Sequence, residues 1–123
     1  MVMVLLVDDD MNLLWALETL VCEEGYEVMT ASNGHEALQA ARRRRPDIVV
    51  SDFMMPVMDG PALIGALGAE PEFATVLVLL SSAVATPPPH LPVGAFLRKP
   101  VAASRLLELL QLHSSQVTVG SSP

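Results

Sequence analysis

The sequence predicts an α/β protein in which a parallel sheet is covered by helices on both faces. Short apolar segments alternate with longer segments in which apolar residues recur every three or four positions. Aspartate, glycine and proline residues stand where these segments begin and end. A chain of 123 residues, 51% apolar and 17% charged, is long enough to form one domain with a packed core.

The N-terminal part of the chain predicts a strand, a helix and a second strand. Residues Met3–Val7 form a continuous apolar run, which is typical of a strand buried on both faces. Asp10 is placed to cap a helix from Met11 to Glu24, and Gly25 ends that helix. Residues Tyr26–Thr30 alternate in polarity and predict a second strand at an edge of the sheet.

The next helix and strand follow from local signals as well. Asn33 and Glu36 have the spacing of a capping box, so a helix is expected to begin there. This helix runs to the arginines at 42–45, a run expected to form its solvated end, and Pro46 stops it. Residues Ile48–Ser51 form the third predicted strand.

The remaining elements complete the alternation of strands and helices. Asp59 is placed to cap a helix over Gly60–Ala69. Residues Val76–Leu80 predict the fourth strand, and Ala95–Leu97 predict a short fifth strand. Residues Val101–His113 carry a leucine stripe and predict the last helix.

Two segments depart from this pattern. Between the fourth and fifth strands the chain carries Pro87–Pro89, and proline lacks the backbone donor that a helix needs. We therefore predict that the fourth helix of the fold is short or missing and that Ala85–Pro92 form no full helix. The domain is predicted to span residues 1–113, and the polar segment 114–123 is predicted to be a disordered tail.

Composition argues against several classes of protein. A net charge of −7 argues against direct nucleic-acid binding. No apolar stretch approaches the roughly 18 residues that cross a bilayer, and the N-terminus lacks the basic start of a signal peptide. A single cysteine cannot form an internal disulfide. The sequence therefore predicts a cytoplasmic protein without a membrane partner.

Polar side chains follow the predicted strands at the edge of the sheet where ligands bind. In open α/β sheets the ligand crevice lies beyond the carboxyl ends of the strands. The residues that fall there are Asp8, Asp9 and Asp10 after the first strand, Asp52 after the third, Ser81 and Ser82 after the fourth, and Lys99 after the fifth. Each of these residues could instead be only a helix cap or a turn residue. Carboxylates that meet from adjacent strands, however, repel each other and require a cation.

The chemistry of this residue set favours a divalent cation and a phosphoryl group. Carboxylate oxygens without a Cys or His partner suit Mg²⁺ or Mn²⁺. Lys99 is the only lysine of the chain, and its ammonium could act with the cation and a hydroxyl to stabilise a phosphoryl group. An aspartate carboxylate can also accept that group covalently.

Four segments follow one another in a specific order: Val7-Asp8-Asp9, Asp52-Phe-Met-Met-Pro-Val-Met-Asp-Gly60, Leu80-Ser81-Ser82 and Phe96-Leu97-Arg98-Lys99-Pro100. Together they resemble the receiver domain of bacterial two-component response regulators, and the resemblance extends to about His113. It implies a flavodoxin-like three-layer fold with a five-stranded parallel sheet in the order 2-1-3-4-5.

The resemblance also implies roles for individual residues. Asp52 would be the phosphoacceptor and would share a Mg²⁺ ion with Asp9, a direct ligand, and Asp8, which acts mostly through water. The backbone carbonyl of Met54 would be a further ligand. Lys99 would contact a phosphoryl oxygen.

The same resemblance implies a switch next to the phosphate. Ser81 would provide the hydroxyl that binds the phosphate and moves toward it, with Ser82 as the alternative if the strand register differs by one. Phe96 would be the aromatic residue that turns inward, although a core position on a short strand is its ordinary alternative. The Lys99–Pro100 peptide bond is expected to be cis.

A receiver would accept a phosphoryl group from a histidine kinase or a phosphotransfer protein and would signal to a downstream effector. It would catalyse only its own phosphorylation and dephosphorylation. The usual dimer face includes the fourth helix, so the chain is expected to be mainly monomeric.

Three alternative functions compete with this interpretation. The first is a pseudo-receiver that acts as an interaction module without phosphorylation; the prolines favour it, but the complete set of acidic residues and Lys99 argues against it. A haloacid-dehalogenase-like phosphatase would need a second aspartate where Met54 stands. A flavin binder would place an unneutralised phosphate against Asp8–Asp10.

Overall fold

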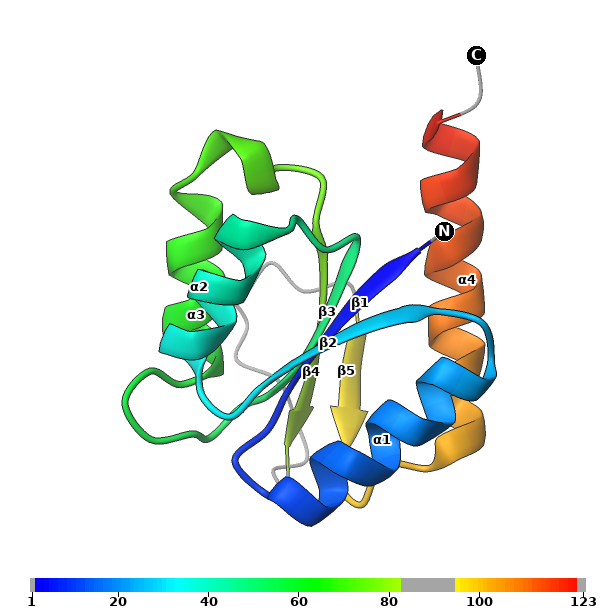
Figure 1. Cartoon of the computed structure of the whole chain (residues 1–123), viewed down its shortest axis with the longest axis horizontal. Coiled ribbons are helices and arrows are strands. Elements are labelled where there is room, and N and C mark those ends of the chain that lie inside the picture. The colour runs from blue at the N-terminus through cyan, green and yellow to red at the C-terminus, as the bar shows by residue number, and fades with distance from the viewer. Residues whose placement is uncertain (1, 83–94, 122–123) are drawn as a thin grey trace.

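Five parallel strands form one sheet in the order β2-β1-β3-β4-β5 (Figure 1). The computed structural model describes residues 2–82 and 95–121, of which 95–96 and 115–121 are described by their backbone alone. The strands are β1 (Met3–Val7), β2 (Glu27–Ala31), β3 (Ile48–Asp52), β4 (Leu77–Ser82) and β5 (Ala95–Arg98). This order and the parallel pairing confirm the predicted fold class.

The helices in the described residues are α1 (Met11–Glu23), α2 (Gly34–Arg43), α3 (Gly60–Gly68) and α4 (Ala103–Ser121), with a short 3-10 turn, η1, at Pro71–Phe73. Three of them begin at the caps that the sequence predicts. The Asp10 carboxylate accepts from Leu13 N at 3.2 Å, the Asn33 side chain from Glu36 N at 2.9 Å, and the Asp59 carboxylate from Ala62 N at 2.9 Å. These contacts satisfy amide donors that the first turn of a helix leaves free.

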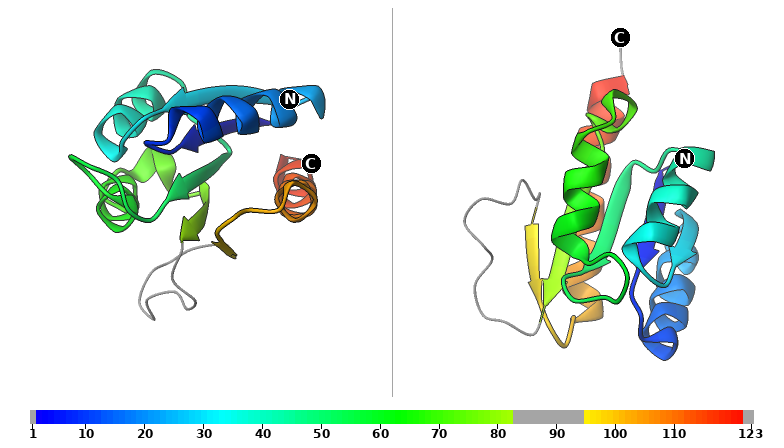
Figure 2. Two further views of the ribbon diagram at one scale, coloured as in Figure 1. Left: turned by 90° about the horizontal axis from the view of Figure 1, so that it is seen from below. Right: turned by 90° about the vertical axis from the view of Figure 1, so that its left-hand side faces the viewer.

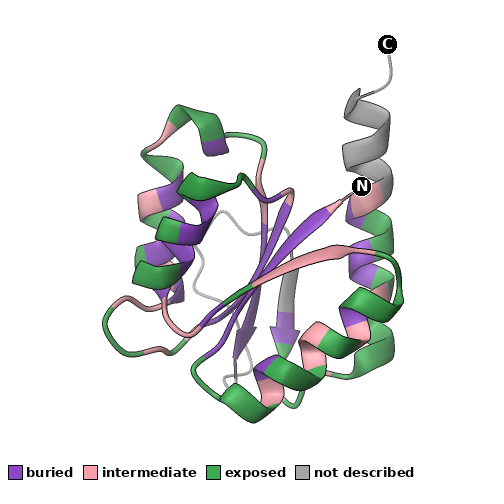
Figure 3. Cartoon of the chain, in the orientation of Figure 1, coloured by how far each residue is buried: buried purple, intermediate pink, exposed green. Residues whose placement is uncertain are grey.

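The helices cover the sheet in two pairs (Figures 1 and 2). Helices α2 and α3 bury one face, with Ala37, Leu38, Leu63, Ile64 and Leu67 in the apolar cluster there. Helices α1 and α4 bury the other, with Leu14, Val21, Leu106, Leu109 and Leu110. The strands between them are buried along most of their length, as Figure 3 shows, whereas the edge strand β2 is only partly covered.

The last helix is longer than predicted. It continues past His113 to Ser121, so the helix end predicted at His113 is wrong, and the backbone of the predicted tail is helical as far as Ser121. No proline occurs between His113 and Ser121, and the Ser114 hydroxyl donates to the Leu110 carbonyl one turn earlier. The predictions for the fourth helix of the fold and for residues Ala85–Pro92 lie outside the described residues.

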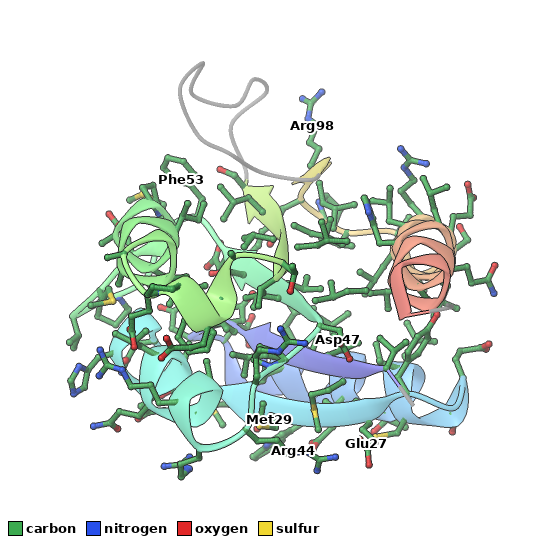
Figure 4. All side chains as sticks on the ribbon, turned by 90° about the horizontal axis from the view of Figure 1, so that it is seen from above. Glu27, Met29, Arg44, Asp47, Phe53 and Arg98 are labelled. Carbon is green, nitrogen blue, oxygen red and sulfur yellow. The ribbon has the colours of Figure 1, made fainter. Side chains whose placement is uncertain are left out.

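The arginine run at the end of α2 holds separate parts of the fold together. Arg42 donates to both carboxylate oxygens of Glu70, with Nη2 3.0 Å from Oε2, and Arg44 pairs with Glu27 on β2. Arg45 Nη1 donates to Thr75 Oγ1 at 3.0 Å. Figure 4 shows Arg44 and Glu27 on the same side of the molecule. These exposed arginines are therefore intramolecular partners, and the solvated helix end predicted from the sequence is only part of their role.

Candidate functional site

The predicted site residues meet at the carboxyl ends of the central strands. Asp8 follows β1, Asp52 is the last residue of β3, Ser81 and Ser82 end β4, and Lys99 follows β5. Asp52 is paired in register with Ser81 on the adjacent strand. Parallel strands bring their carboxyl ends to one edge of the sheet, so residues far apart in sequence converge there.

Three carboxylates form an acidic cluster at this edge. Asp8, Asp9 and Asp52 each place one carboxylate oxygen within 4.8 Å of the others. Asp8 and Asp52 are buried, with 3% and 7% of their surface exposed, whereas Asp9 is exposed to solvent. Anionic oxygens at this spacing repel one another, and a hard divalent cation such as Mg²⁺ suits such a donor set.

Asp10 does not belong to this cluster. Its carboxylate is occupied as the cap of α1, where it accepts from Asn12 N and Leu13 N at 3.1 and 3.2 Å. Its own amide donates to Asp8 Oδ1 at 2.9 Å, so it orients the neighbouring carboxylate through the backbone. The three consecutive aspartates therefore have different surroundings.

Lys99 bridges the two buried carboxylates. Its Nζ lies 3.2 Å from Asp8 Oδ2 and 3.1 Å from Asp52 Oδ1. The Lys99 amide donates to Ser82 O at 2.8 Å, which extends the pairing of β4 and β5 to the base of the side chain. The Lys99–Pro100 peptide bond is cis.

Burial and charge act on the protonation of this pair. Burial raises the pKa of Asp52, and the charge of Asp8 adds to this, while the hydrogen bond from Lys99 and the Met54 amide act in the opposite direction. Burial lowers the pKa of Lys99, but its hydrogen bond to Asp52 and the charges of Asp8 and Asp52 outweigh this effect and raise it. The lysine is therefore held in its charged form.

The loop after β3 is fixed against the site by close backbone contacts. Phe53 N donates to Ser81 O at 2.8 Å, and Gly60 N donates to Phe53 O at 3.0 Å. A Cβ atom on Gly60 would lie only 2.7 Å from Asp52 O, so a glycine is required there. The backbone of Met54 acts to lower the pKa of the Asp52 carboxyl, and Met54 itself is 69% exposed.

The strand register distinguishes the two serines, which the sequence could not do. Ser81 is the partner of Asp52 across β3 and β4, so both side chains lie on the same face of the sheet. Ser82 is the next residue and therefore faces the other way. Both are buried. Phe96 lies on β5 opposite Leu80, but its side chain lies outside the described residues.

Two features of the site region were not identified from the sequence. Gly34, at the start of α2, donates to Met58 O at 2.9 Å and so contacts the loop after β3. Val57 in that loop has a positive φ of 69°. Neither has a local sequence signal, because each depends on the approach of two segments distant in the chain.

Comparison with known proteins identifies the chain's relatives. The family model for the response regulator receiver domain matches residues 4–111. The chain is 39% identical over 125 residues to the transcriptional regulatory protein PrrA of Mycobacterium tuberculosis, covering 96% of this chain and 54% of that protein. It is 36% identical to the probable transcriptional regulator ycf27 of Pyropia yezoensis, covering 84% of this chain and 43% of that protein. The chain thus spans about half the length of these relatives.

A solved structure has the same architecture. The chemotaxis response regulator CheY4 of Vibrio cholerae superposes with a TM-score of 0.85 at 30% identity, covering 92% of this chain and 98% of that one. Among the described residues, no helix is both long and apolar enough to cross a membrane.

Proposed function

Because the chain belongs to the response regulator receiver domain family, we propose that it is a phosphorylation-controlled switch whose phosphoacceptor is Asp52. The observation that carries this proposal is the contact of 3.1 Å between Lys99 Nζ and Asp52 Oδ1 within a cluster of three carboxylates. This arrangement combines a nucleophilic carboxylate with a fixed cation at the ligand-binding edge of the sheet.

The donor set suits one Mg²⁺ ion. We expect Asp9 and Asp52 to ligate the ion directly, Asp8 to act mostly through water, and the Met54 carbonyl to contribute a further oxygen. When bound, the ion would neutralise charge on the phosphoryl oxygens. The exposure of Asp9 leaves this side of the cluster open to an incoming ion.

The phosphoryl group would come from the phosphohistidine of a histidine kinase or a phosphotransfer protein. A carboxylate oxygen of Asp52 attacks phosphorus, the phosphorus–nitrogen bond breaks, and its electron pair returns to the imidazole. The product is an acyl phosphate. Lys99 already lies beside the acceptor oxygen and would stabilise the negative charge of the transferred group without moving far.

The Ser81 hydroxyl and Phe96 would carry the change away from Asp52. Ser81 lies next to the acceptor across the β3–β4 pair, so its hydroxyl is suited to bind a phosphoryl oxygen. Phe96 is on the neighbouring strand β5, paired with the residue before Ser81. A downstream effector would read the altered surface, and the domain would catalyse only its own phosphorylation and dephosphorylation.

Incubation with acetyl phosphate and Mg²⁺ tests this proposal. Intact-mass spectrometry should detect a single added phosphoryl group that is lost at alkaline pH, as an acyl phosphate is. Asp52→Asn should abolish the addition, whereas Asp59→Asn, which keeps a capping side chain on α3, should not. Absence of any adduct would favour a pseudo-receiver, and an adduct on a serine would contradict the proposal.

A further inference from the structure

The loop between β3 and α3, residues 53–59, contains a strained turn at Val57. Its φ is 69°, a region that β-branched residues rarely adopt. The Met58 amide donates to Pro56 O at 2.8 Å across Val57, which makes a γ-turn of the rare hand with positive φ. Val57 is 83% exposed, so burial of its methyl groups does not compensate for the backbone strain.

One side of this turn is held by the N-terminus of α2. Gly34 N donates to Met58 O at 2.9 Å, directly after the strained residue. A Cβ atom at Gly34 would lie 2.5 Å from Met58 O and 2.7 Å from Met58 Cγ, so the two segments pack as closely as a glycine allows. The Met58 carbonyl can make this contact only while the turn at Val57 keeps its present direction.

The other end of the loop is fixed at the carboxyl end of β3. Phe53 N donates to Ser81 O at 2.8 Å, and Gly60 N closes the loop on Phe53 O at 3.0 Å. The strained residue therefore lies between two fixed points, the backbone contacts of Phe53 and the first turn of α2. Strain persists in a structure only where the surroundings determine the conformation.

We infer that the β3–α3 loop, which begins directly after Asp52, is a two-state element that is strained at Val57 and held to the N-terminus of α2 by the Gly34–Met58 hydrogen bond. Breaking the hydrogen bond lets Val57 return to a negative φ. The two-state loop does not depend on phosphorylation, whereas its use in signalling rests on the function proposed above.

A double-mutant cycle on the unphosphorylated chain tests this inference. Val57→Asn relieves the strain, since asparagine tolerates positive φ, and should raise Tm by about 3–8 °C. Gly34→Ala forces the loop away from α2. In the Gly34→Ala background the gain from Val57→Asn should shrink to about 1 °C or less, because the released turn no longer strains Val57.

Amide hydrogen exchange supplies a second readout that needs only single variants. Val57→Asn should slow exchange of the Gly34 amide by about fivefold or more. In the parent chain, opening the Gly34–Met58 hydrogen bond relieves the strain at Val57, and asparagine removes this incentive to open. The matched control is Val57→Ile, which remains β-branched and should leave both Tm and Gly34 exchange as in the parent chain. Equal gains from Val57→Asn in both backgrounds, or unchanged exchange at Gly34, would overturn the inference. If Gly34→Ala does not fold, the exchange comparison decides.

Discussion

Lys99 reaches across strand β4 to contact Asp52 on β3, with Nζ 3.1 Å from Oδ1. The same nitrogen lies 3.2 Å from Asp8 Oδ2 beyond β1, so one cation compensates two buried carboxylates. Lys99 therefore supplies the positive charge that contacts both carboxylates. Any cation that binds there shares the carboxylates with Lys99, and this competition underlies the first prediction.

Removing the Lys99 ammonium should destabilise the fold and strengthen cation binding at the same time. Lys99→Met leaves Asp8 and Asp52 without their cation, and we expect a loss of about 1–3 kcal/mol in the free energy of unfolding without Mg²⁺. Affinity for Mg²⁺ should rise severalfold, because a positive charge next to the site is gone. Urea unfolding and calorimetric titration measure the two effects.

The neighbouring residue provides the control for Lys99. Arg98 is exposed and points away from the sheet in Figure 4, so Arg98→Met removes one charge without touching the site. Arg98→Met should change the free energy of unfolding and the affinity for Mg²⁺ only slightly. A Lys99→Met variant whose Mg²⁺ affinity stays the same or falls would contradict competition between the lysine and the ion.

The consecutive acidic residues Asp9 and Asp10 should differ sharply in their effect on Mg²⁺. Asp9→Asn removes a charge from the carboxylate cluster and should weaken binding about tenfold or more. Asp10→Asn keeps a side chain that caps α1 and lies outside the cluster, so its effect should remain within about twofold. Calorimetry or an NMR titration of each variant measures this, and equal losses would refute the assignment.

Neutralising Asp52 should stabilise the metal-free protein at neutral pH. The pKa of Asp52 is raised in the folded state, chiefly by burial, so the folded state binds a proton more readily than the unfolded state. Stability therefore falls as pH rises from the ordinary aspartate pKa of about 4 through the raised value. Asp52→Asn should raise Tm by roughly 2–5 °C at pH 7, and this advantage should shrink as the pH is lowered through that window.

Thermal unfolding at several pH values, with a chelator present, measures this difference. Mg²⁺ should stabilise the parent chain more than the Asp52→Asn variant, because binding to the folded state alone adds to stability. If the Tm gain from Asp52→Asn grew as the pH was lowered, the pKa of Asp52 would be lowered by folding and not raised, and the prediction would be wrong.

Ser81 and Ser82 should have different effects on phosphorylation. Because Ser81 is in register with Asp52, Ser81→Ala should slow phosphorylation by acetyl phosphate by about tenfold. Ser82 faces the opposite side of the sheet, so Ser82→Ala should change the rate by less than about twofold. The phosphorylation rates of the two variants are measured by intact-mass spectrometry under conditions in which both are folded. A larger effect of Ser82→Ala would assign the phosphate-binding hydroxyl to Ser82.

The oligomeric state also remains a prediction. Pro87–Pro89 occupy the segment that would supply the fourth helix of the usual dimer face, and proline disfavours a helix there. Light scattering should give the mass of a monomer with and without beryllium fluoride as a phosphate mimic. A dimer that forms only with the mimic would contradict this prediction and leave the receiver family unchanged.

Local features of the sequence predict most elements of the fold and the edge of the sheet where the candidate site lies. Asp10, Asn33 and Asp59 predicted helix starts because capping involves residues only two or three positions apart. Continuous apolar runs predicted buried strands, and a parallel sheet necessarily brings their carboxyl ends together. Strand order alone therefore predicts that Asp8, Asp52 and Lys99 lie at one edge of the sheet.

The pairing of these residues depends on contacts between segments that are distant in the sequence. The β3–β4 register pairs Asp52 with Ser81 and not with Ser82, and α4 extends past the polar residues that predicted its end. Val57 has a positive φ in a loop whose next residue, Met58, accepts a hydrogen bond from Gly34 in another part of the chain. Such features depend on contacts between distant segments, which local propensity does not encode. Capping and strand burial, in contrast, depend on residues that are close together in the sequence.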